Sequence, residues 1–203
     1  MQQSPFSIRP LQAQDYPAAI NVCASAMLDN PVHVTVFGQR RELRKRRLLR
    51  FFPRMLAYVG RKGELYGAFS NNELIGVVGM IPPGQCQPGL LDMLRLLPGI
   101  LFSNSPFGLL RTTYWLLRWA RLDPDLPHWH MGPLSVAPEW QGKGAGHLLM
   151  NHAMERGKDD NLYLETDTIE NVRLYESIGF ELLRDVEVMG TRSWLMVKPA
   201  SAA

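Results

Sequence analysis

Three glycines stand within a span of five residues, at Gly142, Gly144 and Gly146. The hydrophobic pattern around them predicts a strand before the turn and a helix over about 144–156 after it. The unpaired N–H groups at the start of a helix attract anions, and glycines let the backbone come close to a bulky phosphate. The turn is therefore predicted to bind a phosphate or pyrophosphate group. The alternative is a tight connection that binds nothing, which would not need three glycines.

Two common phosphate-binding motifs do not fit this turn. A P-loop needs a glycine five positions before Gly142, where Ala137 stands. It also needs a serine or threonine after Lys143, and that position is Gly144. The dinucleotide fingerprint needs its third glycine where His147 stands. The phosphate-containing ligand therefore belongs to another class.

The turn and two flanking stretches resemble the GNAT superfamily of N-acetyltransferases. Its members bind acetyl-coenzyme A through a Gln/Arg-x-x-Gly-x-Gly/Ala motif after a Leu-x-Val-x-Pro strand. They also carry a later Asn, followed by Leu/Phe-Tyr-Glu-x-x-Gly-Phe. The matching residues here are Gln141, Gly144 and Gly146, then Leu134, Val136 and Pro138, and finally Asn171 with the run 174–180. The segment Pro127-His128-Trp129 is similar to the branch that includes puromycin N-acetyltransferase.

The resemblance implies a co-substrate and a set of roles. Acetyl-coenzyme A would place its pyrophosphate on the backbone N–H groups of 141–146 and its pantetheine arm along the backbone of Leu134 and Val136. Tyr175 would be the general acid that protonates the departing thiolate, and its plainer alternative is a core aromatic residue. The residues expected to contact acetyl-coenzyme A are Leu134, Val136, Gln141, Gly142, Lys143, Gly144, Ala145, Gly146 and Asn171.

Amine acetylation also needs a base. An amine with a pKa of about 10.4 arrives protonated, so a base or a water chain must remove a proton before attack. His130 and Glu165 lie on neighbouring predicted strands and are the candidates. Their alternatives are a semi-buried histidine and a structural hydrogen-bond acceptor. His128 and His130 show no third ligand nearby in the sequence, so no metal is expected.

The elements that position these residues are strands and helices in mixed order, with a hairpin at each end of the sheet. Together with the resemblance, this order predicts an α/β (α+β) fold of three layers, with a central mixed, mostly antiparallel sheet and helices on both faces. Gly132-Pro133 disturbs its strand, and the resemblance implies that the strand splays from its neighbour there. The predicted strands are 6–10, 64–69, 74–81, 129–136, 162–166, 180–188 and 191–197, and the predicted helices include 107–122, 144–156 and 169–178.

The segment 82–126 is rich in proline, glycine and leucine, and we predict an irregular elaboration on the acceptor side of the site. Its one expected helix, 107–122, carries many aromatic residues. One stripe of this helix, formed by Leu110, Tyr114 and Leu117, is predicted to pack on the sheet. The neighbouring stripe of Trp115 and Trp119 is expected to line the acceptor pocket.

The chain of 203 residues is predicted to form one domain over 1–199 with a flexible tail over 200–203. Its net charge of only +3 does not indicate nucleic acid, and its longest uncharged run, 96–110, is broken by proline and glycine. Cys23 and Cys86 have no metal-type spacing, and the N-terminus shows no secretory signal. Free thiols and a cytoplasmic location are therefore expected.

These observations predict an acetyl-coenzyme A-dependent N-acetyltransferase that transfers the acetyl group directly to a primary amine, carried by a small molecule. A non-catalytic acyl-coenzyme A-binding module and a protein N-terminal or lysine acetyltransferase are the alternatives. The arginine-rich segment 40–50 could bind a membrane or nucleic acid, but a solvated helix face beside the acceptor cleft is preferred. No nucleic-acid or membrane partner is expected, and a homodimer is left open.

Overall fold

This computed structural model describes residues 6–200, so the expected tail 200–203 lies almost wholly outside the described part. Its strands are β1 (Ser7–Pro10), β2 (Glu64–Ser70), β3 (Glu73–Ile81), β4 (His128–Val136), β5 (Asn161–Thr166), β6 (Glu181–Val188) and β7 (Thr191–Lys198). They form one sheet in the order β1-β2-β3-β4-β5-β7-β6. Every neighbouring pair is antiparallel except β4 and β5. The predicted mixed, mostly antiparallel sheet is confirmed.

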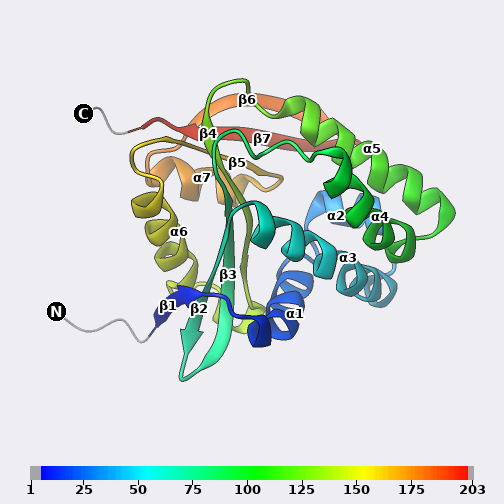
Figure 1. Cartoon of the computed structure of the whole chain (residues 1–203), viewed down its shortest axis with the longest axis horizontal. Helices are drawn as coiled ribbons and strands as arrows, with labels where there is room; N and C mark the ends of the chain where they lie inside the picture. Colours follow the sequence, from blue (N-terminus) through cyan, green and yellow to red (C-terminus); the bar gives the residue numbers. More distant parts are fainter. Residues whose placement is uncertain (1–5, 201–203) are drawn as a thin grey trace.

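Helices cover both faces of this sheet. They are α1 (Tyr16–Ala26), α2 (Pro31–Phe37), α3 (Arg41–Lys62), α4 (Leu90–Ser103), α5 (Pro106–Leu122), α6 (Ala145–Arg156) and α7 (Ile169–Ser177), with 3₁₀ turns at Ala13–Asp15 and Pro138–Trp140. Figure 1 shows α6 and α7 on one side of the sheet and α1 to α5 on the other. Alternate strand residues divide between the two cores, since Leu162 and Leu164 belong to the α6 and α7 side and Tyr163 to the opposite side.

Local turn chemistry explains the two predicted hairpins. Asn71 and Asn72 join β2 to β3, and both have positive φ angles, 48° and 68°, as a tight hairpin turn requires. Met189 and Gly190 join β6 to β7 with φ angles of 55° and 77°. The parallel pair β4 and β5 cannot be joined by such a turn, and α6 provides the crossover between them.

Two helices were not anticipated, α2 and α4, and the expectation of a largely irregular 82–126 segment is wrong. Helix α3 runs through Pro53, and α4 runs through Pro98. A proline removes one helical hydrogen bond, but tertiary packing can outweigh this loss. At Gly99, a Cβ atom would come within 2.7 Å of the Arg54 side chain of α3. The glycine therefore permits close packing of α4 on α3, which holds α4 in helical form.

The two stripes of α5 have the opposite roles from those predicted. Trp115 is buried, and its ring packs against the rings of His33, Phe37 and Phe51. Leu110 and Tyr114 on the other stripe are 67% and 56% exposed. The helix rests on α2 and α4 rather than on the sheet, and this contact reverses which stripe is covered. Neither the packing of Leu110 on the sheet nor the placement of Trp115 in a pocket is correct.

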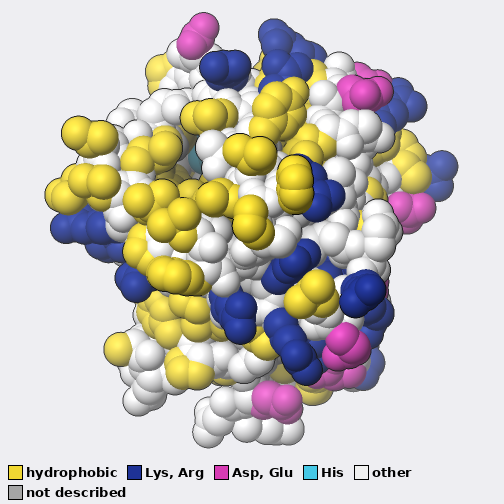
Figure 2. Space-filling model, turned by 90° about the vertical axis from the view of Figure 1, so that its right-hand side faces the viewer, with side chains coloured by type: hydrophobic (Ala, Val, Ile, Leu, Met, Phe, Trp, Pro, Cys, Tyr) yellow, Lys and Arg dark blue, Asp and Glu magenta, His cyan; other side chains and the backbone are white. Residues whose placement is uncertain are grey.

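The outer face of α4 and α5 is apolar with a basic border. Figure 2 shows hydrophobic side chains gathered on this side of the molecule, with Lys and Arg side chains around them. The exposed apolar residues include Leu90, Leu91, Leu94, Phe102 and Phe107. Among the helices of residues 6–200, none has both the length and the hydropathy that crossing a membrane requires.

Candidate active site

The site is built around a fork between β4 and β5. Strand β4 pairs with β5 only from His128 to His130, whereas it continues to pair with β3 as far as Val136. The β3–β4 register shifts between Val78 and Met80, beside Pro133, which has no N–H to give to a ladder. Backbone groups at the end of β4 therefore have a strand partner on one side only.

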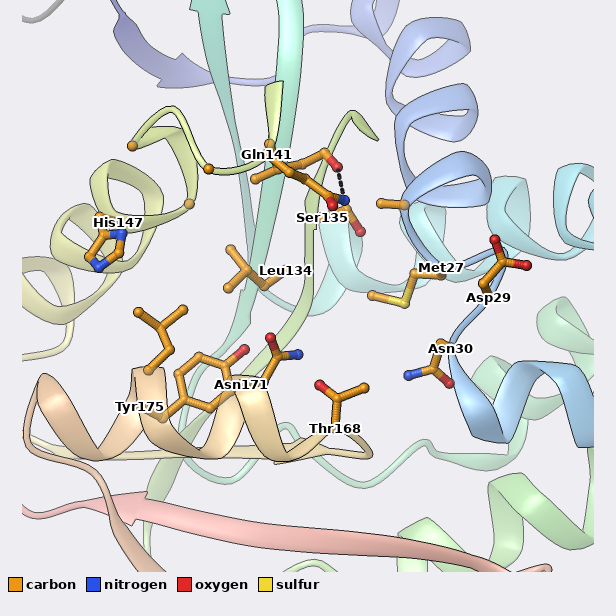
Figure 3. A pocket seen from close by; sticks show the side chains of 16 residues that line it. Met27, Asp29, Asn30, Leu134, Ser135, Gln141, His147, Thr168, Asn171 and Tyr175 are labelled. Carbon is orange, nitrogen blue, oxygen red and sulfur yellow. Dashed lines mark hydrogen bonds between the residues drawn. The ribbon is translucent and has the colours of Figure 1, made fainter. Parts of the chain in front are cut away.

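A cavity of about 590 Å³ opens at this fork. Its walls come from four segments that are distant in sequence: the end of β4, the glycine turn, α7 and the connection between α1 and α2. Figure 3 shows Leu134 and Ser135 of β4 facing Asn171 and Tyr175 of α7 across the open space. The sequence motifs for the strand, the turn and the later helix thus meet around one cavity.

The glycine turn has the backbone form that only glycine adopts easily. Gly142 and Gly144 have φ angles of 71° and 91°, and a Cβ at either position would point into open space. The N–H of Leu148 is the first to close a hydrogen bond along α6, to the carbonyl of Gly144. The N–H groups of 145–147 therefore have no partner within the helix, and they add to the positive end of its dipole. Free N–H groups at the start of a helix are the arrangement that suits an anion.

The other residues of the turn have different surroundings. Gln141 lines the cavity, and its side-chain amide donates a 3.0 Å hydrogen bond to the carbonyl of Val136. Ala145 is fully buried in the core, so only its backbone can reach a ligand. Lys143 is exposed, with its ammonium 5.0 Å from the centre of the Trp140 ring, and it does not line the cavity.

Tyr175 and Asn171 lie one turn apart on α7, and both line the cavity. Tyr175 is 5% exposed, and burial raises the pKa of its hydroxyl to about 12, so this group keeps its proton at neutral pH. No hydrogen bond joins the hydroxyl to another residue of the described range, which leaves it available to a ligand. The side-chain amide of Asn171 donates to the hydroxyl of Thr166 at 3.2 Å.

The structure brings His130 and Glu165 to each other but not to the lining of the cavity. Nε2 of His130 lies 3.2 Å from Oε2 of Glu165, and its Nδ1 lies 3.1 Å from Oδ1 of Asp123. Burial by itself would lower the pKa of His130. The charge of Glu165 and the hydrogen bonds to both carboxylates outweigh burial and raise the pKa well above its ordinary value. Sequence reasoning had not connected Asp123, seven residues before His130, with this pair.

The connection between α1 and α2 forms a wall that sequence reasoning missed. Met27, Asp29 and Asn30 line the cavity, whereas no residue of the described segment 82–126 does. Asn30 caps α2 by accepting from the N–H of His33, and its amide donates to Asp167 at 3.1 Å. The Asn30-Pro31 pair, a cap followed by proline, was a readable signal for a helix start.

The basic segment 40–50 supports this wall instead of forming a fully solvated face. Arg44 is 4% exposed, and it donates to the carbonyl of Gly38 and to the carboxylate of Asp29, each at 2.8 Å. Arg47 donates to the carbonyl of Phe37 at 2.6 Å. The expectation of a wholly solvated face is therefore wrong for Arg44. Its buried side chain stabilises the connection between α1 and α2 through the hydrogen bond to Asp29.

Comparisons with known proteins agree with this geometry. Residues 35–180 match the Acetyltransferase (GNAT) family. The structure of a histone acetyltransferase HPA2 and related acetyltransferase from Corynebacterium glutamicum has 21% identity and a TM-score of 0.74, with 98% of both chains covered. An agmatine N-acetyltransferase has 16% identity and a TM-score of 0.61, covering 97% of this chain and 100% of the other.

A GNAT family acetyltransferase from Brucella melitensis, solved in complex with acetyl-coenzyme A, has 14% identity and a TM-score of 0.53. It covers 97% of this chain and 89% of the other. At these identities the structural likeness shows the shared fold, and the family match, which spans most of the chain, shows the relationship. This chain belongs to the GNAT family of acetyltransferases.

Proposed function

We propose that this protein binds acetyl-coenzyme A and transfers its acetyl group directly to the primary amine of a small molecule. One observation carries the proposal. The unpaired edge of β4, the glycine turn and the Tyr175 hydroxyl all border a single cavity. A phosphate-binding turn, a backbone edge and a proton donor are the three features that this chemistry requires.

Each part of acetyl-coenzyme A has a suitable partner. The pyrophosphate would accept from the backbone N–H groups of 142–147, where the dipole of α6 favours negative charge. The amide groups of pantetheine would extend the sheet by pairing with the backbone of Leu134 and Val136, because β5 no longer does. Asn171 would lie beside the arm. Gln141 would contribute mainly by holding the turn on β4, and Lys143 and the Ala145 side chain would not touch the ligand.

Tyr175 would donate its proton to the departing sulfur. The amine nitrogen forms a bond to the thioester carbonyl carbon, and the C–S bond breaks as the tetrahedral intermediate collapses. The thiolate takes the proton from Tyr175, and the proton that the attacking nitrogen releases returns through solvent to the tyrosinate. Burial keeps the hydroxyl protonated before the step and makes the tyrosinate costly, so this return must be fast.

The amine must lose a proton before it attacks. His130 already contacts Glu165 through one ring nitrogen and Asp123 through the other, and neither His130 nor Glu165 lines the cavity. We therefore propose that water within the cavity, and neither of these side chains, removes this proton.

The acceptor would enter beside the connection between α1 and α2, where Met27, Asn30 and Thr168 offer a small pocket of mixed polarity. A cavity of about 590 Å³ falls in the range of small-molecule sites.

The test is release of free coenzyme A from acetyl-coenzyme A over a panel of amines, with the acetylated product identified by mass spectrometry. The panel should contain polyamines, agmatine, aromatic amines, and peptides with a free N-terminus or lysine. We expect turnover with a small amine and no acetylated enzyme when acetyl-coenzyme A is supplied alone. Binding without turnover across the panel would favour a non-catalytic module, and turnover only with peptides would favour a protein acetyltransferase.

A further inference from the structure

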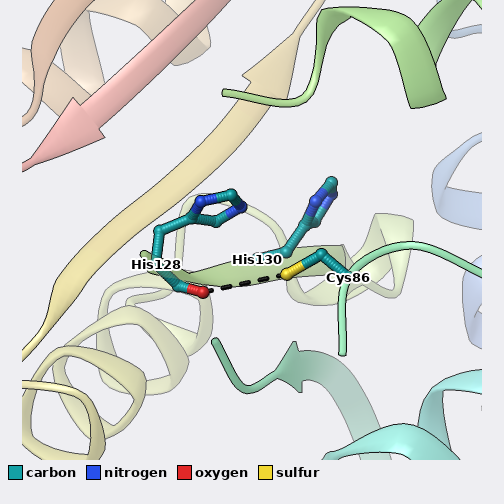
Figure 4. A group of neighbouring side chains, drawn as sticks. All are labelled: Cys86, His128 and His130. Atoms are coloured by element: carbon teal, nitrogen blue, oxygen red, sulfur yellow. Dashed lines mark hydrogen bonds between the residues drawn. The ribbon is translucent and has the colours of Figure 1, made fainter. Parts of the chain in front are cut away.

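We propose that Cys86, Asp123, His128 and His130 form a binding site for Zn²⁺, separate from the acetyl-transfer cavity. The sequence offered no third ligand for the two histidines. The fold supplies one, because the sulfur of Cys86 and one ring nitrogen of each histidine all lie within 4.8 Å of one another. His128 and His130 are two residues apart in β4, so their side chains lie on the same face of the strand. Figure 4 shows both rings above the Cys86 sulfur.

Asp123, at the C-terminal end of α5, lies against both histidines and is the fourth ligand that we assign. Its Oδ1 lies 3.4 Å from Nε2 of His128 and 3.1 Å from Nδ1 of His130. Tetrahedral zinc with bonds of about 2.0–2.2 Å to nitrogen and oxygen holds those ligand atoms about 3.3–3.5 Å apart. The two observed distances differ little from this spacing. The Cys86 sulfur lies 3.7 Å from the carbonyl oxygens of Pro82 and His128, and its side chain would turn from them to join the other three ligands around one ion.

The outer nitrogens of both rings are held as metal-binding histidines usually are. Nδ1 of His128 lies 2.7 Å from the carbonyl of Leu126, so it carries the proton and donates. This leaves Nε2 of His128 buried and aimed at Asp123, with no hydrogen-bond partner among the described residues. His130 contacts the carboxylate of Glu165 through Nε2 and presents Nδ1 to the cluster. A backbone carbonyl behind one ring and a carboxylate behind the other fix the orientation of both ligands.

The ligand chemistry selects the metal. A thiolate and two imidazoles favour zinc over magnesium or calcium, which prefer oxygen ligands alone. A second cavity, of about 340 Å³, is lined by Cys86, Asp123 and His128, and it gives an ion access from the surface.

The position of the cluster indicates a structural role. Cys86 precedes α4 and Asp123 follows α5, so one ion would fasten both ends of the α4–α5 hairpin to β4. His128 and His130 also bound the short stretch in which β4 pairs with β5. The ion would thus stabilise the closed end of the fork from which the acetyl-transfer cavity opens.

The experiment uses the full chain, stripped with a chelator and titrated with Co²⁺ and then Zn²⁺. We expect one Co²⁺ per chain, visible absorption typical of tetrahedral cobalt, and a thiolate-to-cobalt charge-transfer band that Zn²⁺ abolishes. Zn²⁺ should also raise the Tm, because it binds the folded state. Cys86→Ser should remove the charge-transfer band and weaken Zn²⁺ binding at least about tenfold. Glu165→Gln should keep the band but weaken binding by about 10–100-fold.

Two matched controls identify the site. Cys23→Ala removes the other cysteine, a buried residue of α1, and this variant should retain the charge-transfer band. His152→Gln alters a histidine beside Tyr66 and should leave Zn²⁺ affinity unchanged. A folded wild-type chain with neither the band nor a Zn²⁺-dependent Tm would overturn the proposal, and so would a band that survives in Cys86→Ser. If Cys86→Ser does not fold, the wild-type spectrum and Asp123→Asn decide the same question.

Discussion

The side-chain amide of Gln141 donates a 3.0 Å hydrogen bond to the carbonyl oxygen of Val136 and so ties the glycine turn to the end of β4. Gln141→Ala removes this tie while leaving the backbone of the turn intact. A hydrogen bond of this kind contributes about 1 kcal/mol, so we expect roughly fivefold weaker acetyl-coenzyme A binding by calorimetry. Lys143→Ala, at an exposed position two residues away, is the control and should bind normally. Equal affinity for wild type and Gln141→Ala would show that the turn keeps its shape without the tie.

Gly144→Asp should abolish most binding of acetyl-coenzyme A. Gly144 has a φ angle of 91° and caps α6, so an aspartate there adds backbone strain and places a negative charge where the phosphates would lie. We expect affinity to fall at least about tenfold. Gly190→Asp is a matched control, because Gly190 also has a positive φ, 77°, and open space around it, but lies in the β6–β7 turn. A similar loss of affinity in both variants would trace the effect to strain alone.

Tyr175→Phe should lower kcat by about 10²–10⁴, because a general acid is lost while the ring remains to pack against Phe180. The Kd for acetyl-coenzyme A should change little. Single-turnover rates are the better measure, since slow product release would hide a change in the chemical step. Tyr114→Phe removes an exposed hydroxyl on α5 and should leave the rate unaltered. An unchanged single-turnover rate in Tyr175→Phe would exclude this residue as the acid.

Trp115→Ala should destabilise the fold and not change acceptor preference. The Trp115 ring is 7% exposed and packs against Phe37 and Phe51. Removing a buried tryptophan costs about 3–5 kcal/mol, which urea denaturation can measure. Tyr114→Ala, on the exposed stripe, should change stability by no more than about 0.5 kcal/mol. Acceptor-specific changes in kcat/KM for Trp115→Ala, without a loss of stability, would return this residue to the acceptor pocket.

Acid should destabilise the protein partly through His33. Burial, and secondly the charge of Arg44, lower the pKa of His33 to about 4 in the folded state, from 6.5. The unfolded chain therefore binds the proton more readily, so stability is full above pH 6.5 and falls as the pH drops towards 4. The loss from this group is about 3 kcal/mol at its limit. Denaturation of wild type and His33→Gln at pH 7 and pH 5 is the check, and we expect a smaller pH effect in the variant.

The local patterns of the chain determined a large part of this fold and site. Paired turn residues between alternating apolar runs predicted the hairpins, and three glycines before a helical pattern predicted the glycine turn that begins α6. These features depend on backbone conformations and hydrogen bonds among residues close in sequence, so the residue types encode them directly. Asn171 and Tyr175 are separated by one helical turn, which places them on one face whatever the helix packs against.

Only the tertiary structure decided which side chains are buried and which distant residues come into contact. The period of α5 defines two stripes, but the contact with α2 and α4 determined that Trp115 is covered and Tyr114 is exposed. Helix α4 persists through Pro98 because α3 lies close against Gly99. Cys86 stands 42 residues before His128, and no local rule relates them until the α4–α5 hairpin folds back on β4. Burial and side-chain convergence depend on partners distant in the chain, and for that reason the sequence pattern could not assign them.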